Sequence, residues 1–151
     1  MQELKDRIRK EGKVLPGSIV KIDGFLNHRV DCAFMGQIAE EFAKIFDLSQ
    51  VDVVLTAEAS GIALASICAF QWGKPMIFAK KAKSDNIEGG LFKSEIMSYT
   101  YKKKVTLLLS KQWLTPGTRV LIIDDFMARG EAVRRPCALG GGGQAGAGGV
   151  G

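Results

Sequence analysis

The sequence predicts a single α/β domain whose parallel sheet is flanked by helices. The first observation is an alternation of strand-like and helix-like segments between residues 51 and 79, which is typical of a parallel sheet. The second is the run Val120–Ile123, whose four apolar residues match a strand that is buried on both faces. The third is the composition, because 151 residues with 46% hydrophobic and 25% charged side chains can bury one core.

The N-terminal part is expected to contain two helices. Residues 3–11 match a short polar helix in which Leu4 and Ile8 stand one turn apart, so this helix should pack at an edge of the domain. Asp31 is a suitable N-cap for a second helix that runs to Phe46. This second helix should belong to the core through its apolar face, which consists of Phe34, Met35, Ile38, Phe42 and Ile45.

The middle of the chain contains the segments that should build the sheet. Residues 51–55 and 76–79 are expected to be strands, and residues 62–72 between them a helix. Residues 84–104 are polar, rich in lysine and contain a Gly-Gly pair, so we interpret them as a mobile hairpin or lid. A further strand should follow over residues 105–109.

Charge and cysteine content narrow the functional classes. The formal net charge of +5 suits an anionic ligand, and it suits nucleic acid as well. The three cysteines are widely spaced and do not have the spacing of zinc ligands, so buried thiols in a reducing cytosol are expected. The chain has neither a signal peptide nor an apolar run of about 18 residues. We therefore expect a cytoplasmic protein without a membrane partner.

Two adjacent carboxylates, Asp124 and Asp125, come directly after the strand Val120–Ile123. Ligands of open α/β sheets bind beyond the carboxyl ends of such strands. The two acids repel each other unless hydroxyl donors, a metal ion or a cation offset the repulsion. The small-residue loop that follows, Ala128–Ala132, can turn its backbone N–H groups toward a phosphate. A ribose 5-phosphate has both the diol and the phosphate that this arrangement suits. The alternative is a solvated acid pair before an ordinary turn.

Two further loops should reach the same edge of the sheet. Residues 58–61 lead into a helix, so their amides can hold an anion, although an ordinary turn capped by Ser60 has the same pattern. Three lysines, Lys80, Lys81 and Lys83, follow the strand over residues 76–79 and could neutralise an anionic group. The alternative for these lysines is a solvated basic turn.

The aliphatic run, the Asp-Asp pair and the Ala/Gly loop together resemble the motif with which type I phosphoribosyltransferases bind 5-phosphoribosyl 1-pyrophosphate (PRPP). Four segments also follow the order and spacing of the xanthine-using bacterial branch of that family, and they are Gly24–His28, Thr56–Ile62, Phe78–Ser84 and Leu121–Phe126. The resemblance covers residues 1 to about 133. It implies the type I phosphoribosyltransferase fold with a Rossmann-like sheet, a homodimer, and transfer from PRPP to xanthine. No nucleic-acid partner is implied.

The resemblance also implies roles for individual residues. Asp124, Asp125 and Lys81 would be catalytic, the two acids by holding the ribose and the lysine by neutralising the leaving pyrophosphate. The PRPP-binding residues would be Glu58, Ala59, Ser60 and Gly61 of a pyrophosphate loop, Ala128, Arg129, Gly130, Glu131 and Ala132 of a phosphate loop, and Ser98 and Tyr99 of a lid. Mg²⁺ would be the cofactor, bound through the substrate, with Asp124 and Asp125 as its candidate protein ligands.

The base would be held by the N-terminal part of the chain. Residues 1–30 would contribute to a hood over the base, and Val20 and Asn27 match the positions that contact xanthine in the resembling family. The Asn27 amide offers both a donor and an acceptor, which a purine edge requires. Without the resemblance, Asn27 could equally be a turn residue that caps its own backbone.

The sequence departs from the family pattern in two places. Glu131 and Ala132 stand where many relatives close the phosphate loop with a threonine, so the phosphate would be held by backbone amides alone. The family's purine-binding lysine segment and last strands have no counterpart, and residues 136–151 hold eight of the eighteen glycines and no charged residue. We therefore expect a partial phosphoribosyltransferase domain over residues 1–135, incomplete at the C-terminus, followed by a disordered Gly-rich tail over residues 136–151.

Alternatives to an active enzyme remain open at this point. An abrupt loss of foldable pattern suggests a truncated or frameshifted family member with little or no activity, whereas a native flexible tail is the other explanation. A PRPP-sensing purine regulator shares the motif, but the segment before Val51 lacks room for the winged-helix domain of such proteins.

Overall fold

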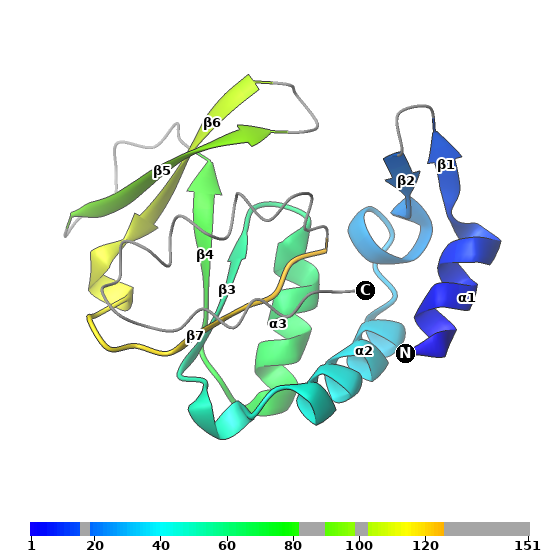
Figure 1. Ribbon diagram of the computed structural model, residues 1–151, viewed down its shortest axis with the longest axis horizontal. Coiled ribbons are helices and arrows are strands. Elements are labelled where there is room, and N and C mark those ends of the chain that lie inside the picture. The colour runs from blue at the N-terminus through cyan, green and yellow to red at the C-terminus, as the bar shows by residue number, and fades with distance from the viewer. Residues whose placement is uncertain (16–18, 82–89, 99–102, 126–151) are drawn as a thin grey trace.

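The computed structural model describes residues 1–15, 19–81, 90–98 and 103–125. Within this part, the chain forms a five-stranded sheet in the order β5-β6-β4-β3-β7 and a separate two-stranded sheet near the N-terminus (Figure 1). Three neighbouring strands of the large sheet are parallel, and they are β3 (Val53–Ala57), β4 (Met76–Lys81) and β7 (Val120–Ile122). The strands expected over residues 51–55, 76–79 and 120–123 are thus confirmed, with ends that differ by up to two residues.

The predicted hairpin is part of the sheet. β5 (Leu91–Ser98) pairs with β6 (Lys103–Ser110) in antiparallel register, and β6 pairs antiparallel with the end of β4. The hairpin therefore extends the parallel strands into a mixed sheet, and its second strand is the one that was expected separately over residues 105–109. Its closure as a lid stays a prediction.

The helices lie where the sequence placed them. They are α1 (Gln2–Glu11), α2 (Cys32–Ile45) and α3 (Gly61–Trp72), and short helical turns occur at η1 (Asp23–Asn27), η2 (Leu48–Gln50) and η3 (Lys111–Trp113). Asp31 is confirmed as the N-cap of α2, because its side chain accepts a hydrogen bond from the Phe34 amide at 3.1 Å. Ile45 does not belong to the core face as predicted. It is 71% exposed, because α2 ends there and packs through its earlier turns.

The core lies on both faces of β3. On one face, α3 packs on the sheet and α2 packs on α3, so Val54, Leu121 and Ile123 meet the buried sides of both helices. On the other face, Val53 and Leu55 pack with side chains of the neighbouring strands. Successive residues of a strand point to opposite faces, which explains why a continuous apolar run is needed here.

The N-terminal lobe consists of α1, η1 and the two-stranded sheet of β1 (Lys13–Leu15) and β2 (Ile19–Lys21). Its residues Phe25 and Leu26 belong to the main core, and Arg7 adds a polar link. The Arg7 guanidinium lies 4.8 Å from the ring centre of Phe25 and 4.5 Å from that of Phe34. It also forms an ion pair of 2.8 Å with Asp31. A guanidinium can stack on aromatic faces and bind a carboxylate in this way at the same time. Arg7 thus joins α1 to η1 and to the start of α2.

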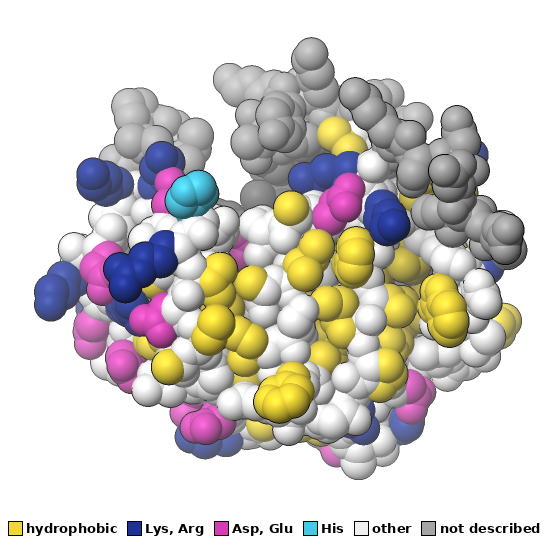
Figure 2. Space-filling view, turned by 180° about the vertical axis from the view of Figure 1, so that it is seen from behind, with side chains coloured by type: hydrophobic (Ala, Val, Ile, Leu, Met, Phe, Trp, Pro, Cys, Tyr) yellow, Lys and Arg dark blue, Asp and Glu magenta, His cyan; other side chains and the backbone are white. Residues whose placement is uncertain are grey.

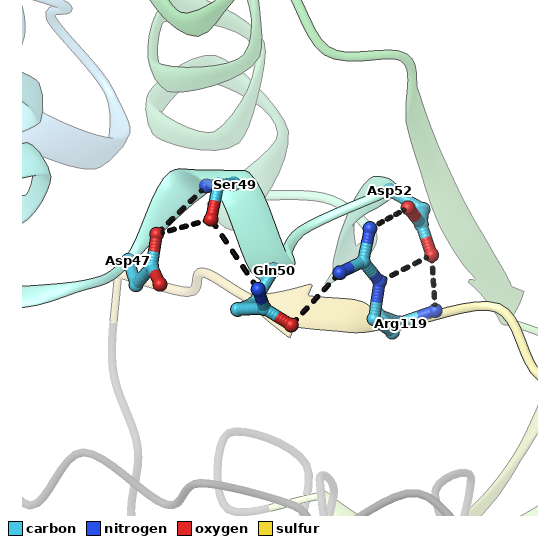
Figure 3. A network of polar contacts seen from close by, with 5 residues as sticks. All are labelled: Asp47, Ser49, Gln50, Asp52 and Arg119. Carbon is cyan, nitrogen blue, oxygen red and sulfur yellow. Dashed lines mark hydrogen bonds and ion pairs between the residues drawn. The ribbon is translucent and has the colours of Figure 1, made fainter.

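A network of polar contacts ties the amino-terminal ends of β3 and β7 together (Figure 3). Arg119 donates to both carboxylate oxygens of Asp52, at 3.0 and 2.6 Å, and to Gln50 at 2.9 Å. The Arg119 amide also donates to Asp52 at 2.8 Å. These hydrogen bonds lower the pKa of Asp52 to about 2. Such a two-point contact fixes the start of β7 beside the start of β3.

The Asp52–Arg119 pair predicts a pH-dependent term in stability. Because the pKa of Asp52 is lowered from 3.8 to about 2 in the folded state, its contribution is present above about pH 4 and is lost as the pH falls through about 2. We expect the free energy of unfolding to fall less steeply over this range in Asp52→Asn than in the unchanged chain. Urea unfolding between pH 5 and 2 measures this, with Glu40→Gln on the exposed side of α2 as the control. Equal slopes in Asp52→Asn and the unchanged chain would contradict it.

Candidate active site

The carboxyl ends of β4, β3 and β7 meet at one edge of the sheet (Figure 1). Lys81 is the last residue of β4, Glu58 follows β3 directly, and Asp124 lies two residues after the end of β7. The Ile123 amide donates to the Leu55 carbonyl at 3.0 Å, so the pairing continues up to the acid pair. The prediction that residues 58–61 and the acid pair share one edge is therefore confirmed.

Asp125 is the point where three predicted segments come together. The Ser60 hydroxyl donates to Asp125 Oδ1 at 2.9 Å, and the Asn27 side-chain amide donates to Asp125 Oδ2 at 3.1 Å. Asn27 comes from η1 in the N-terminal lobe, 98 residues away in the sequence. Ser60 occupies the N-cap position of α3, but its side chain makes no capping hydrogen bond there. The binding roles of these residues stay predictions.

Asp124 is turned into the protein beneath the start of α3. Burial is the main reason that the pKa of its carboxyl group rises to about 7, and the neighbouring Asp125 raises it further. The Asp125 amide, which donates to Asp124 at 2.9 Å, and the charge of Lys81 act in the opposite direction. The repulsion expected between the two acids thus contributes to the raised pKa of Asp124. As a result, the Asp124 carboxyl group is only partly ionised near neutral pH.

Gly61 makes this position of Asp124 possible. A Cβ atom built on Gly61 would overlap with the Asp124 carboxylate and with the Thr56 hydroxyl. The Thr56 side chain is 2% exposed, and its hydroxyl has no hydrogen-bond partner within the described residues. Thr56 was not predicted from the sequence as a site residue. The available signal was a hydroxyl at the end of an otherwise apolar strand.

The loop between β3 and α3 is joined to the end of β4. The carboxylate of Glu58 accepts a hydrogen bond from the Lys81 amide, and the Glu58 amide donates to the Ala79 carbonyl at 3.0 Å. The loop also contains a cis peptide bond between Glu58 and Ala59. The side chains of Lys81, Ala59 and Ser60 are exposed at this edge. They can therefore meet a ligand, while Glu58 is engaged with the protein backbone.

Two other predicted site residues lie on strands outside this group. Val20 lies on β2, opposite Val14. Ser98 ends β5, which runs in the same direction as β4, so it lies on the carboxyl-end side of the sheet, with three strands between β5 and β7. The binding roles of both residues stay predictions. Six predicted PRPP-binding residues lie outside the described residues, and they are Tyr99, Ala128, Arg129, Gly130, Glu131 and Ala132.

The acid pair fits a metal ion that takes most of its ligands from elsewhere. No group of three or more His, Cys, Asp or Glu side chains in the described ranges could hold a metal on its own. Mg²⁺ commonly binds through one or two carboxylates together with water and substrate phosphates. Asp124 and Asp125 match this pattern.

None of the helices in the described ranges is long and apolar enough to cross a membrane.

Comparison with known sequences identifies close relatives. The chain is 48% identical over 139 residues to the xanthine phosphoribosyltransferase of Lachnoclostridium phytofermentans, a match that covers 92% of this chain and 69% of that protein. It is 44% identical over 134 residues to the enzyme of the same name from Lactobacillus gasseri, covering 89% of this chain and 70% of that protein. Xanthine phosphoribosyltransferase 1 of Clostridium perfringens is 46% identical over 135 residues, with 89% and 71% covered. No family model matches the chain.

Solved structures show the same fold at low sequence identity. The adenine phosphoribosyltransferase of Giardia lamblia, in complex with 9-deazaadenine, matches with a TM-score of 0.73 and 22% identity, covering 90% of this chain and 75% of that one. The adenine phosphoribosyltransferase of Saccharomyces cerevisiae matches with a TM-score of 0.69 and 17% identity, covering 92% and 81%. These similarities confirm the predicted fold class.

The contact at Gly61 predicts that even one methyl group is harmful there. Gly61→Ala should lower the free energy of unfolding by about 1–3 kcal/mol, because Asp124 or Thr56 must move. Helix propensity alone would raise the free energy of unfolding of Gly61→Ala by up to about 1 kcal/mol. The sign of the measured change therefore distinguishes steric overlap from helix propensity. Urea unfolding measures it. Gly24→Ala is the matched control, since a Cβ there meets nothing within 4 Å. A Gly61→Ala chain as stable as the unchanged one would contradict the packing.

Proposed function

The chain belongs to the xanthine phosphoribosyltransferase family of type I phosphoribosyltransferases, and on this premise we propose that it transfers the 5-phosphoribosyl group of PRPP to xanthine. The products would be XMP and pyrophosphate, in purine salvage. The observation that carries this proposal is the meeting of Ser60, Asn27 and the acid pair at one edge of the sheet. The relatives are named as transferases, which favours an enzyme over a PRPP-sensing regulator.

The ribose would be held by the acid pair. Its two hydroxyl groups would donate to the carboxylates of Asp124 and Asp125, which follow β7 at the same edge of the sheet as the loop after β3. As the bond between the anomeric carbon and pyrophosphate breaks, positive charge develops on the sugar, and nearby carboxylates stabilise it. N9 of xanthine then forms the new bond to that carbon and its proton leaves to solvent. A covalent protein nucleophile is not required.

The leaving pyrophosphate would be stabilised from the other side. The loop over residues 58–61 ends at the N-terminus of α3, where the backbone N–H groups of the first turn and the helix dipole favour an anion. The exposed ammonium of Lys81 stands at the same edge. Mg²⁺, when bound, would neutralise charge on the pyrophosphate oxygens, with Asp124 and Asp125 as the protein groups that hold it.

The proposal extends to assembly and location. We propose a cytoplasmic homodimer, as the family resemblance implies. Hydrophobic side chains gather in the middle of one face of the molecule (Figure 2). The Phe70 side chain of α3 is 86% exposed, and contact with a second subunit would bury it. Burial raises the pKa of the Cys68 thiol to about 12, so this cysteine is a packed, unreactive thiol suited to a reducing compartment. Light scattering measures the mass of the assembly.

The acid pair predicts the behaviour of a double variant. Asp124→Asn with Asp125→Asn should weaken PRPP binding in the presence of Mg²⁺ by more than about 100-fold, because the ribose and the metal lose both carboxylates. The fold should remain, since asparagine keeps the volume of the side chains. Calorimetric titration measures the affinity, and circular dichroism the fold. Asp52→Asn at the opposite end of β3 is the matched control and should bind PRPP normally. Unchanged affinity in the folded double variant would overturn the assignment.

Transfer itself is tested by xanthine-dependent release of pyrophosphate. The chain spans about 70% of the length of its relatives, such as that from Lactobacillus gasseri. We expect the chain to release pyrophosphate from PRPP in the presence of xanthine and not in its absence. Guanine and hypoxanthine in place of xanthine serve as controls for the base. A chain that binds PRPP but releases no pyrophosphate with xanthine would overturn the proposed reaction.

A further inference from the structure

One hydrogen bond connects the residue expected to meet the base with the residue expected to meet the ribose. Asn27 Nδ2 donates to Asp125 Oδ2 at 3.1 Å. The other oxygen of the same carboxylate accepts from Ser60 at 2.9 Å. Both oxygens of Asp125 are therefore engaged with protein donors from two different segments.

This arrangement opposes both ligands of the proposed reaction. A ribose diol donates two O–H groups to the carboxylate, where a protein donor already occupies one acceptor position on each oxygen. A purine uses the donor and acceptor of the Asn27 amide, one of whose two N–H groups is turned to Asp125. Both ligands therefore draw on groups that the same protein hydrogen bond engages.

We propose that the Asn27–Asp125 hydrogen bond couples the base site to the ribose site. This coupling rests on the proposed function. Binding of the ribose phosphate breaks the hydrogen bond and leaves Asn27 free for the base, and binding of the base leaves Asp125 free for the ribose. The ligand that arrives second no longer has to break the bond, so each ligand raises the affinity for the other by the same factor. A hydrogen bond between exposed groups corresponds to about threefold to tenfold in affinity.

The surrounding structure allows the Asn27 side chain to move while its backbone stays in place. Phe25 and Leu26, which precede it in η1, are buried. The Arg29 amide donates to the Asp23 carbonyl at 2.8 Å, and the Asp31 amide donates to the Phe25 carbonyl at 3.0 Å. Asn27 itself is exposed. A rotation of its side chain is therefore enough to break the bond, with no rearrangement of the N-terminal lobe.

The test uses ribose 5-phosphate with Mg²⁺ as the probe, because it has the diol and the phosphate but no leaving group and cannot react. In the unchanged chain, saturating xanthine should tighten ribose 5-phosphate binding by about threefold to tenfold, and the reverse titration should give the same factor. In Asn27→Ala, ribose 5-phosphate should bind tighter than to the unchanged chain by this factor even without xanthine. Calorimetric titration measures all three affinities.

Ser60→Ala is the matched control, because it removes the other hydrogen bond on Asp125 and leaves Asn27 in place. The effect of xanthine on ribose 5-phosphate binding should persist in this variant. An unchanged or weaker affinity for ribose 5-phosphate in folded Asn27→Ala would overturn the coupling, and so would equal affinities with and without xanthine in the unchanged chain. If the unchanged chain does not bind ribose 5-phosphate at all, the proposed function fails and not the coupling alone.

Discussion

The candidate site depends on the parallel pairing of β3 with β4 on one side and with β7 on the other. The register aligns Leu55 with Ile77 in β4 and with Ile122 in β7. Side chains alternate between the faces of a strand, so a slip of β7 by one residue would turn Leu121 and Ile123 out of the core and Asp124 to the opposite face. The buried apolar run that excludes such a slip also fixes where the two acids stand.

The two ends of the β3–β7 strand pair show how the environment determines the pKa of an aspartate. Asp52 is exposed and bound by Arg119, which lowers its pKa to about 2 and makes it a charged partner in a clamp. Asp124 is buried next to a second acid, which raises its pKa to about 7. One end of the strand pair thus carries a satisfied ion pair that stabilises the frame. The other carries a carboxyl group in need of donors, which is the property expected of a binding site.

Local patterns in the sequence predicted most of the frame and the edge at which the site lies. The N-cap at Asp31, the helix over residues 61–72 and the apolar run before Asp124 are each determined by near neighbours. Contacts between distant segments were not predictable in this way. Neither the hydrogen bond from Asn27 to Asp125 nor the closeness of Gly61 to Asp124 has a periodic pattern in the sequence. The membership of the hairpin in the large sheet also depends on pairing with β4, which composition does not indicate.

The pairing of β7 also has a consequence for the order in which the protein assembles. Asp52 and Arg119 are 67 residues apart, and β4, β5 and β6 lie between β3 and β7 in the sequence. Contacts of such long sequence separation form late and slowly during folding. On the ribosome, β3 is therefore complete well before β7 emerges, and one of its edges stays open in the meantime. An open apolar edge is a template for pairing with other chains, so the interval before β7 docks is when a newly made chain is most exposed to aggregation.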